Sequence, residues 1–389
     1  MSPASGVTGL RERAGALLAE LAAGAADRER LRELPRAEVR RLAEAGLFTF
    51  RVPARYGGAG SSVEEVIGFV VDLAAADSNI AQAVRPCFGR VEALLAGPET
   101  DRQVWFPRFL AGDVFGNAGW ETGGPNGAVG SRITRHGDHY KVNGVKFYST
   151  GALFADWIGS VAVDEEGRKV FFTVPRDRPG LRLVDDFDGI GQRLTASGTT
   201  ELDDVTVHPE EIVHRDAGEG RSPVTPFLQL YLAAVQAGIA RNALADAVAF
   251  ARERARPIQH SGAVRSVDDP YVRQAVGEIS ARAYAAEAAV LRAAGAIDRA
   301  WRDGLSPASL TGASVEVAQA QFFAAEAALK AGELLFDVAG GSATLRGHNL
   351  DRHWRNARTV ASHNPRQWKA AVVGAHHLTG AEPPVNGLF

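Results

Sequence analysis

A histidine stands at a break in a helical stretch near the C-terminal end of the sequence. Residues 350–380 have the composition of helices, but Ser362, His363, Asn364 and Pro365 interrupt them. Proline lacks the amide hydrogen that a helix needs, and it pushes the preceding residue out of the α region. Histidine can donate, accept or carry a proton near neutral pH. The break is therefore either an ordinary loop or the place where an imidazole faces a site.

Several other chemistries are excluded by motifs that the sequence lacks. Its single cysteine, Cys87, cannot form an internal disulfide or a multi-cysteine metal site. The histidines do not have the His-Glu-x-x-His spacing of a zinc enzyme, and we expect no metal. There is no Gly-x-Gly-x-x-Gly after a strand, no P-loop and no Gly-x-Ser-x-Gly nucleophile elbow. The chain thus has no nicotinamide-binding fingerprint of its own.

The composition narrows the class of protein. The 389 residues carry a net charge of −3 with a pI near 6.4, which gives no basic footprint for nucleic acid. No run approaches the roughly 18 apolar residues of a membrane helix, and the first residues lack a secretory signal. Hydrophobic residues make up 46% of the chain, as in globular proteins. We expect a cytoplasmic protein of two or three domains, without nucleic acid or membrane partners.

Three regions differ in the periodicity of their apolar residues. Residues 7–110 have helical spacing, residues 113–215 read as strands, and residues 224–380 return to four long helical stretches. In the middle region, Asn143-Gly144 predicts a hairpin turn, and Glu166-Gly167 predicts a second one. We expect a mainly α protein with a central antiparallel β domain. Its parts are an N-terminal helical domain (1–112), a β-barrel domain (113–220) and a four-helix bundle (221–389).

Four stretches in order resemble the acyl-CoA dehydrogenase superfamily. They are GNAGWETGGPNGAVGSR, YKVNGVKFYSTGALFADW, GQRLTASGTTELDDVTV and GGSATL. The family has the same order of helical domain, β barrel and four-helix bundle, and the resemblance covers nearly the whole chain. FYSTGALFADW, GQRLTASGTT and LDRHWRNARTVASHNP are similar to its flavin-dependent monooxygenase branch, which includes dibenzothiophene monooxygenase and sulfur-acquisition oxidoreductases.

That branch implies a two-component flavin-dependent monooxygenase. A separate flavin reductase would supply reduced FMN, which we prefer over FAD, and the enzyme would combine it with O2. The resulting C4a-hydroperoxide must be shielded from water. It would oxygenate a small neutral substrate. An organosulfur compound is the preferred candidate, and an amine or aromatic compound is the next. The resemblance also implies a homotetramer.

A missing carboxylate separates this branch from the dehydrogenases. An acyl-CoA dehydrogenase needs a carboxylate base to remove the proton beside the thioester carbonyl. By the resemblance, Asn364 stands where the commonest dehydrogenases have that base, and no Asp or Glu occurs from Arg352 to Ala381. A dehydrogenase with its base moved to Asp246 or Glu253 stays open, although both look like solvated helix charges. A degenerate, non-catalytic family member also stays open.

The resemblance assigns roles to individual residues. Asn117, Thr150 and His363 fall where the branch places its catalytic amide, hydroxyl and imidazole, and His363 would be a donor or proton shuttle. The expected flavin-binding residues are Asn117, Trp120, Tyr148, Ser149, Thr150, Asn364 and, on the phosphate, Arg254 or Arg256. The expected substrate pocket consists of Cys87, Val91, Arg193 and Ser197.

Each of these residues also has an ordinary structural interpretation. Cys87 can be a buried small hydrophobic residue, and Asn117 can be a turn residue that bonds its own backbone. The arginines after residue 252 can belong to a solvated helix end. Arg352 and Arg355, three positions apart, are expected in packing and subunit contacts.

Overall fold

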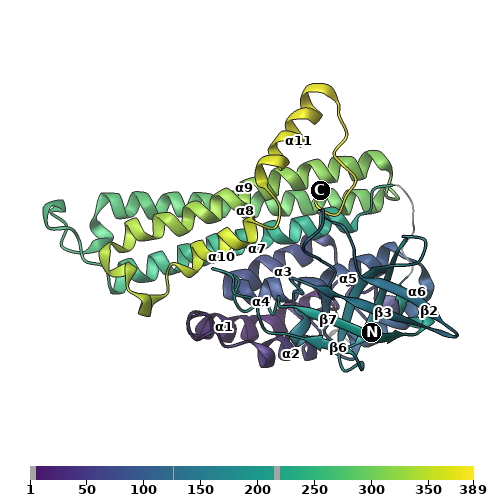
Figure 1. The fold of residues 1–389 in the computed structure, drawn as a ribbon. Coiled ribbons are helices and arrows are strands. Elements are labelled where there is room, and N and C mark those ends of the chain that lie inside the picture. Colours follow the sequence, from purple (N-terminus) through teal and green to yellow (C-terminus); the bar gives the residue numbers. More distant parts are fainter. Residues whose placement is uncertain (1–5, 126, 214–219) are drawn as a thin grey trace.

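The computed structural model describes residues 6–125, 127–213 and 220–389. In Figure 1 the N-terminal helices and the sheet lie side by side beneath a long bundle formed by the C-terminal helices. This is the order of regions expected from the sequence. Within the described residues, no helix combines the length and apolar character needed to cross a membrane.

The N-terminal helices follow their local signals. Ser62 begins α3 with a capping box, in which its hydroxyl and the Glu65 side chain each bond the other's backbone N–H. Asp77 caps the next helix by accepting from the amides of Asn79 and Ile80. The helices are α1 (Val7–Leu31), α2 (Arg36–Glu44), α3 (Val63–Ala76), α4 (Ser78–Ala83), α5 (Arg85–Ala96) and α6 (Glu99–Leu110).

The strands form one sheet with the order β6-β7-β3-β2-β4-β5-β8, and β1 lies beside β4. They are β1 (Phe115–Ala118), β2 (Arg132–His136), β3 (His139–Lys146), β4 (Trp157–Val163), β5 (Lys169–Pro175), β6 (Leu181–Leu183), β7 (Thr200–Val207) and β8 (Ile212–Val213). In the described residues β6 and β8 remain at opposite ends, so the expected barrel is a sheet with two edges. The pairing is mixed, because β1 runs parallel to β4. The hairpin turning at Glu166-Gly167 is confirmed as β4–β5.

The hairpin predicted at Asn143-Gly144 is wrong. Strand β3 runs straight through both residues and pairs with β2 on one side and β7 on the other. The β3–β7 register shifts here by a bulge, and the Asn143 side chain accepts a hydrogen bond of 2.8 Å from the Asp204 N–H. A Cβ on Gly144 would lie 2.0 Å from the Ser131 hydroxyl oxygen. Glycine therefore serves a close approach of two strands, not a turn.

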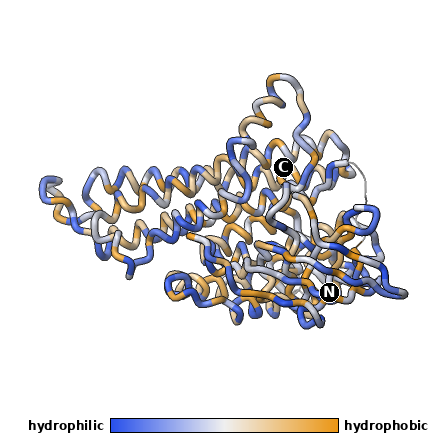
Figure 2. Tube along the Cα trace, in the orientation of Figure 1, coloured by the Kyte–Doolittle hydropathy of each residue, from blue (hydrophilic) through white to orange (hydrophobic). Residues whose placement is uncertain are grey.

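The C-terminal bundle is built around α7 (Val224–Glu253), α8 (Pro270–Arg302) and α9 (Pro307–Ala339). Helix α7 packs on α3 as well as on α8 and α9, and most of its first half is buried. A Cβ on Gly238 would lie 2.4 Å from the Ala74 Cβ, so small residues allow α7 and α3 to approach closely. Figure 2 shows hydrophobic segments concentrated where the bundle crosses the N-terminal helices.

The predicted break near Pro365 is confirmed. Helix α10 (Arg352–Ala361) ends before it, and α11 (Arg366–Thr379) begins directly after it. In Figure 1 α11 turns away from the axis of the bundle. His363 and Asn364 therefore lie at a corner of the chain, outside both helices.

Candidate active site

Three of the predicted residues meet beside the sheet. The backbone N–H of Asn117 in β1 donates to the Thr150 carbonyl at 3.1 Å. The Thr150 hydroxyl lies 3.0 Å from the Ser197 hydroxyl, and both side chains are buried. Asn117 keeps an exposed side chain. Asn117 and Thr150 thus adjoin through their backbones, and the Thr150 hydroxyl contacts one expected pocket residue.

A glycine fixes the position of Thr150. Gly151 has a φ of +75°, and a Cβ there would lie only 2.4 Å from the Ala83 carbonyl oxygen. Both the backbone conformation and the space favour glycine. The segment after β3 therefore sits directly against the turn between α4 and α5.

Aromatic surface lies next to this segment. Trp120 is bridged to Phe147 by a backbone hydrogen bond of 2.8 Å, and it is partly exposed. Tyr148 is 54% exposed. Ser149, in contrast, is buried and accepts a hydrogen bond of 2.8 Å from the Thr200 hydroxyl. Accessible aromatic faces beside an unpaired amide can receive a planar polar ring.

His363 reaches the same area from the other end of the chain. Its Nε2 lies 3.2 Å from Nε2 of Gln82 in α4. Burial, and then the charge of Arg85, lower the pKa of His363 to about 3. The residue nevertheless keeps exposed surface. The ring therefore has protein around it and still reaches solvent on one side. The imidazole is therefore neutral, and with the Gln82 amide donating, its own proton is on Nδ1.

Asn364 anchors the corner that carries this histidine. Its amide nitrogen donates to the side-chain oxygen of Gln229 in α7. Gln321 in α9 donates to the same oxygen at 3.2 Å. The Asn364 Oδ1 atom is buried and has no hydrogen-bond partner among the described residues. The Asn364 amide is held by the bundle, and one acceptor remains available.

Comparison with known proteins bears on this arrangement. Models described as acyl-CoA dehydrogenase N-terminal domain and acyl-CoA dehydrogenase C-terminal domain match residues 9–113 and 230–368. Dibenzothiophene monooxygenase from Rhodococcus qingshengii is 30% identical over 380 residues, covering 93% of this chain and 91% of that protein. The chain belongs to the acyl-CoA dehydrogenase family.

Similar members of this family are flavin-dependent monooxygenases. A probable FMNH2-dependent monooxygenase, SfnC from Pseudomonas putida, is 29% identical over 379 residues and covers 94% of each chain. The FMN-bound structure of TdsC from Paenibacillus sp. A11-2 matches with a TM-score of 0.90 at 28% identity, covering 96% of this chain and 99% of that one. The structure of methanesulfinate monooxygenase MsuC from Pseudomonas fluorescens matches with a TM-score of 0.88 at 29% identity, covering 100% of both chains. The predicted fold class and the monooxygenase branch are confirmed.

Two expected pocket residues of this family member face its core. Cys87 has no accessible surface, and its thiol donates to the Phe115 carbonyl at 3.4 Å. Burial raises the pKa of the thiol to about 12, so it stays protonated. Val91, one helical turn further, is also buried. In this structure both residues pack α5 against β1 and the core.

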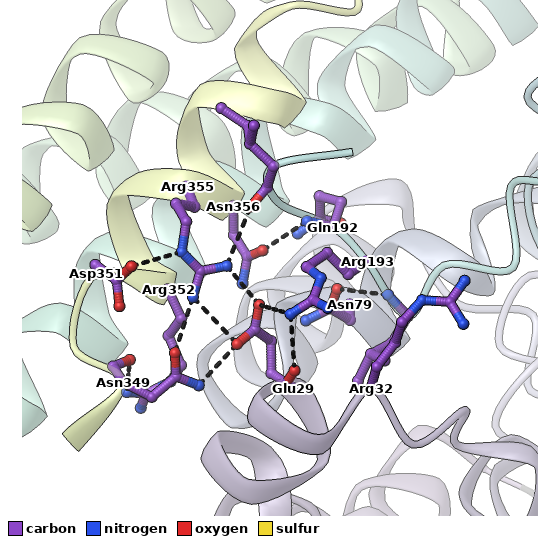
Figure 3. Close-up of polar contacts among 12 residues, drawn as sticks. Glu29, Arg32, Asn79, Gln192, Arg193, Asn349, Asp351, Arg352, Arg355 and Asn356 are labelled. Carbon is purple, nitrogen blue, oxygen red and sulfur yellow. Dashed lines mark hydrogen bonds and ion pairs between the residues drawn. The ribbon is translucent and has the colours of Figure 1, made fainter. Parts of the chain in front are cut away.

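Arg193 belongs to a polar cluster around a buried glutamate (Figure 3). It lies 3.9 Å from a carboxylate oxygen of Glu29, which Arg355 binds more closely at 2.6 Å. Asn349 donates to the same carboxylate at 2.7 Å. Burial raises the pKa of Glu29, but the hydrogen bonds from Arg355 and Asn349 lower it overall. Arg355 therefore joins the bundle to α1 within one chain, where we expected packing and subunit contacts.

The arginines expected on the flavin phosphate lie far from His363 within one chain. Arg254 follows α7 directly and contacts His348 at 3.0 Å, whereas Gln229 near the start of α7 bonds Asn364. Twenty-five residues of helix separate Arg254 from Gln229, which is about 37 Å at 1.5 Å per residue. Arg254 and Arg256 are both exposed. They can meet a flavin at His363 only from another copy of the chain.

The two relocated-base candidates have different surroundings. Asp246 was expected to be solvated, but it accepts from Arg352 at 2.6 Å and from His353 at 2.8 Å. Burial raises the pKa of Asp246, but the bonds and charges of His353 and Arg352 lower it overall. A carboxylate held in this way is a poor proton acceptor. Glu253 is exposed at the last residue of α7, as expected.

Gln82 and Arg85 are site residues that the sequence did not single out. Both lie in IAQAVRPCF, where an amide and a guanidinium interrupt mainly apolar residues. That interruption was the available signal. It carries little weight alone, because polar residues on helices usually face solvent.

Proposed function

We propose that the chain is a two-component monooxygenase that uses reduced FMN and O2, through a flavin C4a-hydroperoxide, to oxygenate a small organic substrate. An organosulfur compound, an amine or an aromatic compound is the expected class. The observation that carries the proposal is a neutral His363, held by Gln82, beside Asn364, the amide that by the resemblance stands where dehydrogenases have their base. A dehydrogenase needs a proton acceptor there, whereas an oxygenase needs neutral donors.

The residues present fit FMN. Asn117 offers a side-chain amide that has no partner in the described part of the chain, and Trp120 and Tyr148 offer accessible rings. The buried oxygens of Gln82 and Asn364 have no partner among the described residues, so they can accept from ring N–H groups. Reduced FMN, when bound, supplies the electrons and activated oxygen that the side chains of this chain lack. A separate reductase would deliver it.

The side chains around the site would control protons and water. His363 holds a proton on Nδ1 while Nε2 is occupied by the Gln82 amide. Thr150 can rotate its hydroxyl, because the Ser197 hydroxyl at 3.0 Å can act as donor or acceptor. A bound flavin and substrate would have to cover the exposed side chains of Asn117, Tyr148 and His363 to keep water from the site. Neutral hydrogen-bond donors at such a site suit oxygen transfer.

Rapid mixing tests the proposal. Purified protein, loaded anaerobically with reduced FMN, would be mixed with oxygenated buffer while absorbance is followed in the C4a-adduct band. We expect a transient that decays slowly, and a weaker one with reduced FAD. Immediate reoxidation, after reduced FMN has been shown to bind, would contradict the proposal. Bleaching of bound flavin by an acyl-CoA would then identify a dehydrogenase.

We also propose a cytoplasmic homotetramer. The position of Arg254 supports it, since that arginine can reach a flavin only from another copy. A groove of about 640 Å³ on the bundle supports it as well, because Phe323 and Trp354 line it and both are well exposed. Sedimentation at several protein concentrations tests the oligomeric state.

A further inference from the structure

Arg85 is a deep cation without a counter-ion. It is the first residue of α5, and its side chain is only partly exposed. Among the described residues, its guanidinium makes no ion pair and no hydrogen bond. Burial lowers the pKa of Arg85 to about 10, so the side chain remains charged at neutral pH.

Other arginines in the interior of this chain have partners. Arg51 binds the buried carboxylate of Glu92 at 2.7 Å. Arg352 binds Asp246, and Arg355 binds Glu29, each at 2.6 Å. A buried charge without a partner is costly for a folded protein. Arg85 therefore keeps a binding capacity that its own chain does not use.

The neighbours of Arg85 belong to the candidate active site. Its charge contributes to the low pKa of His363. Gln82, the partner of His363, lies in α4 only three residues before Arg85, which begins α5. Gly151 contacts the turn that leads into Arg85. The phenol of Tyr231 is buried and donates to the Ala81 carbonyl at 2.7 Å, so it supplies no negative charge.

We propose that Arg85 binds an acidic group of the substrate, so that this enzyme oxygenates a small organic acid whose sulfinate, sulfonate or carboxylate sits against the guanidinium. This inference rests on the proposed function and replaces the neutral substrate expected from the sequence. A guanidinium can hold two oxygens of such a group with parallel N–H donors. The neutral His363 beside it adds a donor without adding charge. The acid would thus be oriented with its apolar part toward the remaining pocket.

Calorimetric titration of the full-length protein with oxidised FMN bound tests the inference without turnover. The probes are benzenesulfinate, benzoate and methyl phenyl sulfone, which is a neutral analogue. We expect benzenesulfinate or benzoate to bind more tightly than the sulfone. Arg85→Gln should weaken binding of that anion at least about tenfold and leave the sulfone unchanged. The anion affinity of Arg85→Lys should lie between those of wild type and Arg85→Gln, because lysine keeps the charge but not the planar guanidinium.

Matched controls separate the outcomes. Arg292→Gln removes the same charge from a side chain that is 80% exposed, and it should leave all affinities unchanged. If Arg85→Gln does not fold, Arg85→Lys must still lower the anion affinity while the sulfone affinity is kept.

Three results would overturn the inference. They are equal anion affinity in wild type and Arg85→Gln, no anion binding to wild type, and loss of FMN affinity in Arg85→Gln in place of anion affinity. The last result would assign the guanidinium to the flavin. Failure of the proposed function is seen separately, as absence of a flavin–oxygen transient in wild type.

Discussion

Gln82 and His363 are 281 positions apart in the sequence, yet their Nε2 atoms lie 3.2 Å apart. The contact joins α4 of the N-terminal region to the corner between α10 and α11. It also fixes the ring, since one nitrogen is occupied and the other stays free. A neutral imidazole with a fixed proton is suited to donating a hydrogen bond, and the low pKa prevents it from becoming a cation in neutral buffer.

His363→Ala should lower the rate of substrate oxygenation roughly a hundredfold, because it removes a positioned donor. Reduced FMN should still bind, since the proposed flavin contacts come mainly from β1 and the 148–151 segment. Stopped-flow absorbance should show a flavin–oxygen transient that decays faster than in wild type. His377→Ala, an exposed histidine near the end of α11, is the matched control. Normal oxygenation by His363→Ala would remove this residue from the mechanism.

Gly151→Ala should destabilise the protein by about 2 kcal/mol. The added Cβ meets the Ala83 carbonyl oxygen at 2.4 Å, and the φ of +75° is strained for alanine. FMN affinity should fall too, because the movement displaces Thr150. Gly167 has a similar φ of +79°, but a Cβ there would meet open space. Gly167→Ala should therefore lower the free energy of unfolding by only about 1 kcal/mol. Urea unfolding measures both, and equal losses would show that the contact with Ala83 is unimportant.

The parts of this fold that the sequence predicted depend on local chemistry. Pro365 follows polar residues that already favour a break, and Ser62 caps α3 through a residue three positions away. The Asn143-Gly144 error has a non-local cause, because Ser131 and Asp204 on neighbouring strands decide the conformation. A turn signal cannot report such neighbours.

The candidate site also contains residues that the sequence pointed to and residues that it did not. Asn117, Thr150 and His363 came from a resemblance, and the structure brings Asn117 and Thr150 together while His363 approaches the same turn. Gln82 and Arg85 were missed because their significance depends on a partner 281 positions away or on the absence of a carboxylate nearby. Neither fact is encoded in local spacing.

The low pKa of His363 predicts an acid sensitivity with a defined sign. The folded pKa is about 3, whereas the ordinary value is 6.5. The unfolded chain therefore binds the proton more readily, so this group stabilises the fold fully above pH 6.5. Its contribution is lost progressively as the pH falls from 6.5 toward 3. His363→Gln should lose less stability than wild type between pH 7 and pH 4.5 in urea titrations, and His377→Gln should behave like wild type. Identical pH dependence in all three proteins would contradict the assigned pKa.

Asp246→Asn distinguishes a structural carboxylate from a catalytic base. Asp246 accepts from Arg352 and His353 in the interior, so its neutralisation leaves a buried cation without its partner. We expect a loss of about 3 kcal/mol in the free energy of unfolding, while the flavin–oxygen transient persists at low temperature. Glu253→Gln, at an exposed position, should change neither quantity. If Asp246→Asn instead kept its stability and abolished reduction of bound flavin by an acyl-CoA, Asp246 would be a dehydrogenase base. That result would favour dehydrogenation over oxygenation, because removal of the proton beside a thioester carbonyl requires a carboxylate base.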